Sequence, residues 1–110
     1  MVLKLDRHMD TIANGPDIEE DQTLTLEVRR VEVGKRFTIP SDDVVARFDV
    51  KRFGPSSTGK GFKGYLIVKK VEKDAVVAEV NLVVEATTAD GSYKETARFR
   101  GDHTFLRELR

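Results

Sequence analysis

The sequence contains no cysteine and no tryptophan, and it has only two histidines, His8 and His103, among its 110 residues. A chain without cysteine has no disulfides, thiolate zinc sites, iron–sulfur clusters or cysteine nucleophiles. The two histidines lack the spacing of a zinc motif, and no serine lies in a Gly-x-Ser-x-Gly elbow. We therefore expect no metal and no cofactor, and a non-catalytic function is favoured over an enzyme.

Long hydrophobic runs are absent as well. The longest apolar stretches are interrupted within a few residues, and residues 1–5 are too short and too charged for a signal peptide. Hydrophobic residues make up 39% of the chain and charged residues 35%, a balance typical of soluble globular proteins. The expected protein is soluble, without membrane contact, and cytoplasmic.

The first 22 residues differ in pattern from the rest of the chain. Leu5, Met9 and Ile12 have helical spacing and precede Asn14-Gly15-Pro16, which is typical of a helix end. Residues 17–22 are acidic and follow neither period, which indicates a solvated linker. We predict a short helix and an acidic linker over 1–22, followed by an antiparallel β domain over 23–110, with the whole chain forming one folding unit.

Hydrophobic residues alternate with polar ones from Thr23 onward. This period of two predicts strands over 23–33, with a bulge near Arg29, over 36–39 and over 44–53. Residues 54–61 nearly spell a phosphate-binding loop, but Gly61 stands where a hydroxyl should bind magnesium, and no helix follows. We interpret this segment as a mobile loop.

Two turns predict the register of the last three strands. A turn at Lys73-Asp74 sets Val71 opposite Val76 and Tyr65 opposite Leu82, and a turn at Asp90-Gly91 sets Leu82 opposite Phe99. Both hairpins bury the same face of the shared strand, formed by Val76, Ala78, Val80, Leu82, Val84 and Ala86. The expected fold is mainly β, an antiparallel meander of about six strands forming a barrel or half-barrel, with one short N-terminal helix.

Such a domain has two surfaces on which it could bind a partner. An interior cavity would be lined by Phe48, Tyr65, Ile67, Leu82, Tyr93 and Phe99. The outer face of the predicted hairpins carries Leu66, Val68, Val77 and Val83 among charged residues, which is too apolar to lie in water uncovered. The N-terminal helix, a second copy of the chain in a homodimer, or a protein partner would cover it. The first hypothesis is therefore a binding or protein-interaction module.

The net charge is zero, yet the charges are segregated along the chain. Residues 46–73 contain eight Lys and Arg against two Asp and Glu, whereas residues 6–27 contain seven acids against one Arg. The basic segment could bind a polyanion, or the acidic segment could lie against it.

Within the basic segment, residues 50–53 and 60–67 resemble the two basic, aromatic strands of cold-shock domains. The resemblance implies base stacking on aromatic side chains and phosphate binding by lysines. The residues involved are Lys51, Arg52, Phe53, Lys60, Phe62, Lys63 and Tyr65. Phe62 and Tyr65 are three positions apart, so they share a face only if a bulge occurs at Lys63-Gly64. The alternative function is single-stranded nucleic-acid binding through the hairpin over 47–70.

Overall fold

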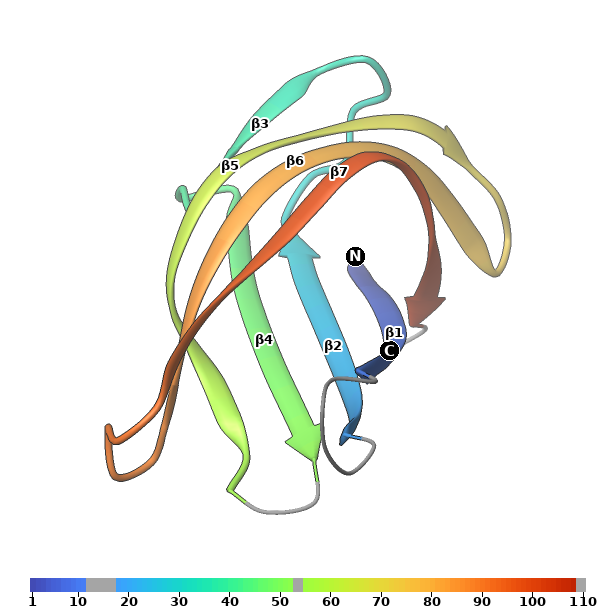
Figure 1. The fold of residues 1–110 in the computed structure, drawn as a ribbon. Coiled ribbons are helices and arrows are strands. Elements are labelled where there is room, and N and C mark those ends of the chain that lie inside the picture. Colours follow the sequence, from blue (N-terminus) through green and yellow to red (C-terminus); the bar gives the residue numbers. More distant parts are fainter. Residues whose placement is uncertain (12–17, 53–54, 109–110) are drawn as a thin grey trace.

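The computed structural model describes residues 1–11, 18–52 and 55–108, which form seven strands and no helix (Figure 1). The strands are β1 (Val2–Thr11), β2 (Ile18–Val28), β3 (Arg36–Ile39), β4 (Val44–Arg52), β5 (Ser57–Val71), β6 (Ala75–Thr88) and β7 (Lys94–Glu108). The described residues accordingly include no helix able to cross a membrane.

The sheet closes into a six-stranded antiparallel barrel. In the order β5, β4, β2, β1, β7, β6 each strand pairs with the next, and β6 pairs back with β5. β4 joins β5 only through Asp49 and Val50, and further along β5 its place is taken by β3. Closure satisfies the backbone hydrogen-bonding groups that a flat sheet leaves unpaired at its edges. The mainly β barrel predicted from the sequence is confirmed.

The predicted N-terminal helix is wrong, because the segment that contains Leu5 and Met9 is strand β1. It pairs with β2 over its whole length and with β7 at Val2, Leu3 and Lys4. Ile12 and the Asn-Gly-Pro signal lie outside the described residues. The acidic linker is wrong for residues 18–22, which belong to β2. Barrel closure requires a strand between β2 and β7, and this requirement overrides the local helical spacing.

The turn at Asp90-Gly91 forms as predicted. Val84 lies opposite Ala97, Leu82 lies opposite Phe99, and all six predicted inward residues of β6 are buried. Gly91 has a φ of 73°, a conformation that glycine adopts without strain. Alternation together with a strong turn signal was therefore sufficient to predict β6 and its pairing with β7.

The register of β5 against β6 differs from the prediction by one residue. Val71 faces Val76 as expected, but a bulge between Val68 and Lys70 places Gly64, not Tyr65, opposite Leu82. A shift of one residue exchanges the two faces of a strand. Leu66 and Val68 are therefore completely buried in the core, and Tyr65 and Ile67 lie on the outside.

The predicted mobile loop over 54–61 is partly strand, because β5 begins at Ser57. A second bulge, between Gly59 and Gly61, allows Phe62 to turn inward opposite Val84. A Cβ atom at Gly59 would lie 2.7 Å from Cζ of Phe62 and 2.9 Å from Cβ of Phe48. Gly59, one of the glycines that resemble a phosphate loop, thus makes room for an aromatic ring.

Aromatic rings fill the middle of the barrel. Phe48 and Phe99 meet edge to face, with their centroids 5.8 Å apart, and both are buried together with Leu82. The other three predicted cavity residues lie elsewhere: Tyr65 and Ile67 point outward, and Tyr93 is 54% exposed. The predicted cavity lining is therefore divided between the core and the surface.

Candidate binding face on strands β5, β6 and β7

The outer side of β5, β6 and β7 carries several cations side by side. The register aligns Lys63 with Val83 and Arg98 in one row, and Tyr65 with Asn81 and Arg100 in the next. Arg36 of β3 lies over the Tyr65 ring, 3.8 Å from its centroid. We call this set the basic face: Arg36, Lys63, Tyr65, Asn81, Val83, Arg98 and Arg100.

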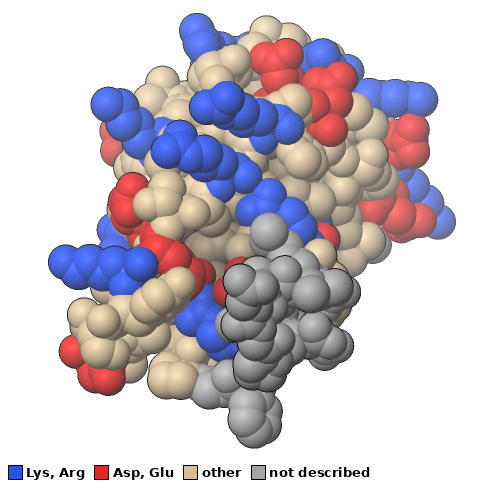
Figure 2. All heavy atoms as spheres, viewed as in Figure 1, with Lys and Arg blue, Asp and Glu red and all other residues tan. Residues whose placement is uncertain are grey.

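Three cations of the basic face have no anionic partner. Within the described parts of the chain, the side chains of Lys63, Arg98 and Arg100 form no ion pair and no hydrogen bond. In the part of Figure 2 where Figure 1 draws β5, β6 and β7, Lys and Arg side chains lie next to one another, and acidic side chains lie around them. These charges are available to a ligand.

The acidic residues beside the basic face are already engaged. Glu79 lies 3.8 Å from Lys69 and accepts a hydrogen bond from the Tyr65 hydroxyl, and Asp102 lies 3.0 Å from Lys69. The hydrogen bond to Asp102 and its charge raise the pKa of Lys69. Glu85 accepts a hydrogen bond from the Thr96 hydroxyl. The acids thus bind neighbouring groups and leave the cations of the basic face unneutralised.

A shallow depression of about 340 Å³ adjoins this face. It is lined by Gly61, Phe62, Lys63, Val83 and Glu85. Phe62 lines the depression, but its side chain packs inward against the core and is half-buried. The depression therefore combines the apolar residues Phe62 and Val83 with the charged residues Lys63 and Glu85.

The residues predicted to bind nucleic acid do not share one face, because some point into the barrel and others point outward. Lys51, Lys60 and Lys63 are exposed, whereas Phe53 lies outside the described residues. No bulge occurs at Lys63-Gly64, so Phe62 points inward and Tyr65 outward. Lys63 and Phe62 meet at the depression, but the two aromatic rings do not form one stacking surface.

Arg52 is the clearest departure from the predicted arrangement, because it points into one end of the barrel. It donates hydrogen bonds to Glu20 (2.9 Å), to Glu95 and to the Ser57 hydroxyl (3.1 Å). Burial lowers the pKa of Arg52, but hydrogen bonds and charges of Glu20 and Glu95 outweigh this effect and raise it overall. Arg52 therefore belongs to a structural network and is too buried to form part of a binding surface.

Sequence reasoning missed the interior polar network at this end of the barrel. Arg7 donates to Gln22 Oε1 from Nε (2.9 Å) and from Nη2 (2.6 Å), and Gln22 donates to Glu20 (2.7 Å). The Arg7 guanidinium also lies 4.1 Å from the centroid of the Phe99 ring. Burial lowers the pKa of Arg7, and the negative charge of Glu20, which acts in the opposite direction, offsets only part of this effect. The signal was present, since Glu20 and Gln22 continue the inward alternation of Leu24 and Leu26.

The four predicted interface residues do not form one patch. Leu66 and Val68 are in the core because of the β5 bulge, which is a correction to their predicted outward position. Val77 and Val83 do lie half-buried on the outside of β6, but Glu79 and Asn81 stand between them on the same face. The apolar area on the outer face of β5 and β6 is therefore much smaller than the sequence indicated.

The histidines lie far from a metal-site arrangement. His8 Nδ1 lies 2.6 Å from Asp21 Oδ1, and His103 Nε2 lies 2.9 Å from the carbonyl oxygen of Arg100. Among the described residues no group of three or more His, Asp or Glu side chains is placed to hold a metal ion.

The fold and the basic face together define a small antiparallel β-barrel with a cationic outer wall. Comparison of the chain with protein-family models, with curated proteins and with solved structures finds no significant match.

Proposed function

We propose that this protein is a non-catalytic binding module that holds a polyanion on the basic face. The observation that carries the proposal is that Arg98 and Arg100 are successive outward residues of β7 and that Lys63 lies two strands away in the same row as Arg98, all without an acidic partner. Neighbouring strands lie about 4.8 Å apart, so the cations of β5 and β7 flank Val83 and Asn81 of β6 at a spacing that one extended ligand can bridge. Isolated surface cations gain little from single anions, whereas several acting together bind a polyanion strongly at low salt.

A second candidate is a single-stranded nucleic acid as that polyanion. It is favoured by the depression beside Lys63, because Val83 and Phe62 are among its lining residues and make part of it apolar, as a contact for a base requires. Arg36 covers Tyr65, which leaves the Phe62 depression as the better contact for a base. An acidic protein segment would use the same cations without needing this depression.

Binding can be measured by fluorescence anisotropy at low salt, with a labelled mixed-sequence DNA oligonucleotide and with labelled polyglutamate. We expect binding that weakens steeply as salt rises, and at least tenfold weaker binding for Arg98→Gln/Arg100→Gln. The matched control is Arg29→Gln/Arg30→Gln, which removes the same charge from exposed positions just after β2, and it should bind as the wild type does.

The two labelled polymers separate the candidates. If DNA binds more tightly than polyglutamate and Val83→Asp abolishes the difference, the nucleic acid is the ligand. Equal binding of both polymers supports a polyanion module without base contacts. Absence of binding by either polymer, or equal loss in the Arg29→Gln/Arg30→Gln control, would overturn the proposal.

A further inference from the structure

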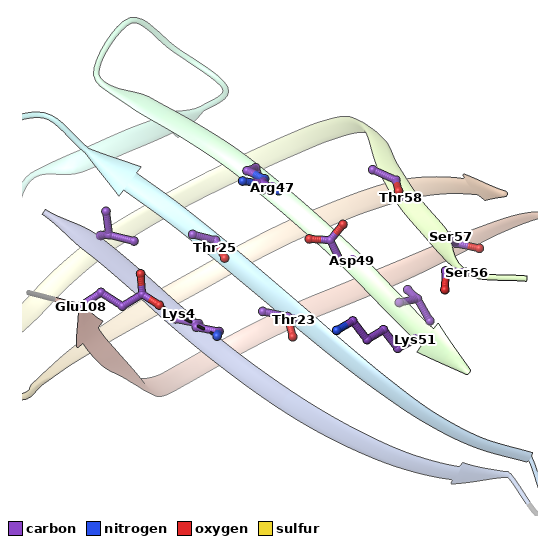
Figure 3. A pocket seen from close by; sticks show the side chains of 12 residues that line it. Lys4, Thr23, Thr25, Arg47, Asp49, Lys51, Ser56, Ser57, Thr58 and Glu108 are labelled. Atoms are coloured by element: carbon purple, nitrogen blue, oxygen red, sulfur yellow. Dashed lines mark ion pairs between the residues drawn. The ribbon is translucent and has the colours of Figure 1, made fainter. Parts of the chain in front are cut away.

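A polar groove of about 410 Å³ lies on another wall of the barrel, across the outer faces of β1, β2 and β4 (Figure 3). Its wall residues include Lys4, Thr25, Arg47, Asp49, Lys51 and Thr58. This volume falls in the range of sites for small molecules, which is about 300 to 1,000 Å³. The groove is therefore large enough for a ligand of the size of a monosaccharide derivative.

Strand register brings these side chains together from segments far apart in the chain. Lys4 of β1 lies opposite Thr25 of β2, which lies opposite Arg47 of β4. The next row contains Thr23, Asp49 and Thr58 from three different strands. In the view of Figure 3, Lys4 and Lys51 extend toward Thr23 from opposite sides. The groove is thus built by the sheet, and its positions are held by backbone pairing.

The cations of the groove are available for binding. Across the described ranges 1–11, 18–52 and 55–108, the side chains of Arg47 and Lys51 form no ion pair and no hydrogen bond. Lys4 has only a long contact of 3.9 Å with Glu108, and both side chains are more than a third exposed. Water weakens such an exposed pair, so Lys4 can turn to a ligand at small cost.

The remaining groups of the groove suit hydroxyls better than they suit bases or apolar rings. Thr25, Thr58 and Ser56 offer hydroxyl groups, and none of the described residues that line the groove is aromatic. The Asp49 carboxylate lies between Arg47 and Lys51 along β4 and has no hydrogen-bond partner among the described residues. An unpaired carboxylate accepts hydrogen bonds from hydroxyls and repels a second anionic group. This arrangement disfavours a polyanion that runs along β4.

We propose that the groove binds a polyhydroxylated phosphate ester, such as a sugar phosphate, with Arg47 and Lys4, which flank Thr25 in one row, on the phosphate and with Asp49 and the threonine hydroxyls on the sugar. Arginine recognises phosphate through two parallel hydrogen bonds, which makes Arg47 the main anion contact. The site is separate from the basic face and does not depend on the function proposed for it.

The test is a titration of the ¹⁵N-labelled protein, followed by the backbone amide resonances, with glucose 6-phosphate, glucose and inorganic phosphate in turn. We expect glucose 6-phosphate to shift resonances of β1, β2 and β4 and to bind at least tenfold more tightly than either fragment. Arg47→Gln and Asp49→Asn should each weaken this binding about tenfold, which corresponds to 1.4 kcal/mol. Arg98→Gln is the matched control on the basic face and should leave the binding unchanged.

Three outcomes would overturn the inference. Equal affinity for inorganic phosphate and glucose 6-phosphate would mean that the groove attracts anions without recognising hydroxyls. Shifts confined to β5, β6 and β7 would place the ligand on the basic face. No shift at millimolar ligand would remove the site altogether, and it would leave the polyanion proposal untouched. The amide spectra of the variants also report whether each one is folded.

Discussion

Arg52 and Glu95 are 43 positions apart in the chain, yet Arg52 Nη2 donates a hydrogen bond to Glu95 Oε2 at the end of the barrel. Their side chains are only 12% and 15% exposed, and Glu20 binds the same guanidinium from β2. One arginine of β4 therefore joins β2 to β7 through two carboxylates. The network neutralises part of the acidic stretch, while the basic face remains free.

Replacing this arginine should destabilise the protein strongly. Arg52→Met leaves Glu20 and Glu95 largely buried without a counter-ion, and we expect the free energy of unfolding to fall by about 3 kcal/mol at pH 7. Urea denaturation at pH 7 of the wild type and of Arg52→Met measures this difference. A loss well below about 1 kcal/mol would show that the network contributes little.

Because of the bulge in β5, polar substitutions at two neighbouring positions should lower the free energy of unfolding by different amounts. Leu66 is completely buried, so Leu66→Ser should lower the free energy of unfolding by about 3 kcal/mol or more. Ile67 is half-buried on the outside, and Ile67→Ser should cost about 1 kcal/mol. Urea denaturation of the two variants compares them directly. The reverse ranking would mean that the bulge is absent and that the simple register holds.

Gly64 marks a close approach between β5 and β6. A Cβ atom at this position would lie 1.9 Å from the carbonyl oxygen of Asn81, which is backbone and cannot move aside cheaply. Gly64→Ala should therefore cost about 3 kcal/mol or prevent folding, measured by thermal denaturation with circular dichroism. Gly61→Ala is the control, because its Cβ would meet only the Glu85 side chain at 3.7 Å. Equal stability of the two variants would contradict the close approach.

Asp90 makes the stability of the β6–β7 turn dependent on pH. Hydrogen bonds from the Ser92 backbone N–H, the Ser92 hydroxyl and the Thr88 hydroxyl lower the pKa of Asp90 to about 2. The pKa of an unfolded aspartate is about 3.9, so the contribution of Asp90 is complete above that pH and is lost as the pH falls through about 2.

The comparison of wild type with Asp90→Asn isolates this contribution. The wild type should have the higher melting temperature at pH 5, and the difference should shrink as the pH is lowered toward 2. A difference that stays constant from pH 5 to pH 2 would show that the carboxylate charge has no part in the turn.

The sequence by itself determined the class of fold, the inward face of β6 and its pairing with β7. These features depend on strict alternation and on an Asp-Gly turn, which act between residues close in the chain. It also predicted β3 over 36–39, the position of β4 and the exposure of Lys51, Lys60 and Lys63. Local signals were sufficient for β6 and β7, where alternation is joined by a strong turn signal, but not for the register of β5, although its partner β6 is the next strand along the chain.

Only the tertiary structure decided that residues 2–11 form a strand, which side chains of β5 face inward, and that Arg52 points into the barrel. β1 is a strand because β2 and β7, from opposite ends of the chain, both pair with it. The bulges of β5 fit that strand to β6, and they exchange Leu66 and Val68 with Tyr65 and Ile67. Arg52 turns inward because Glu20 and Glu95 meet at the barrel end. For β1 and Arg52 the deciding contact joins residues that only barrel closure brings together, whereas the phase of β5 depends on bulges within its own hairpin with β6.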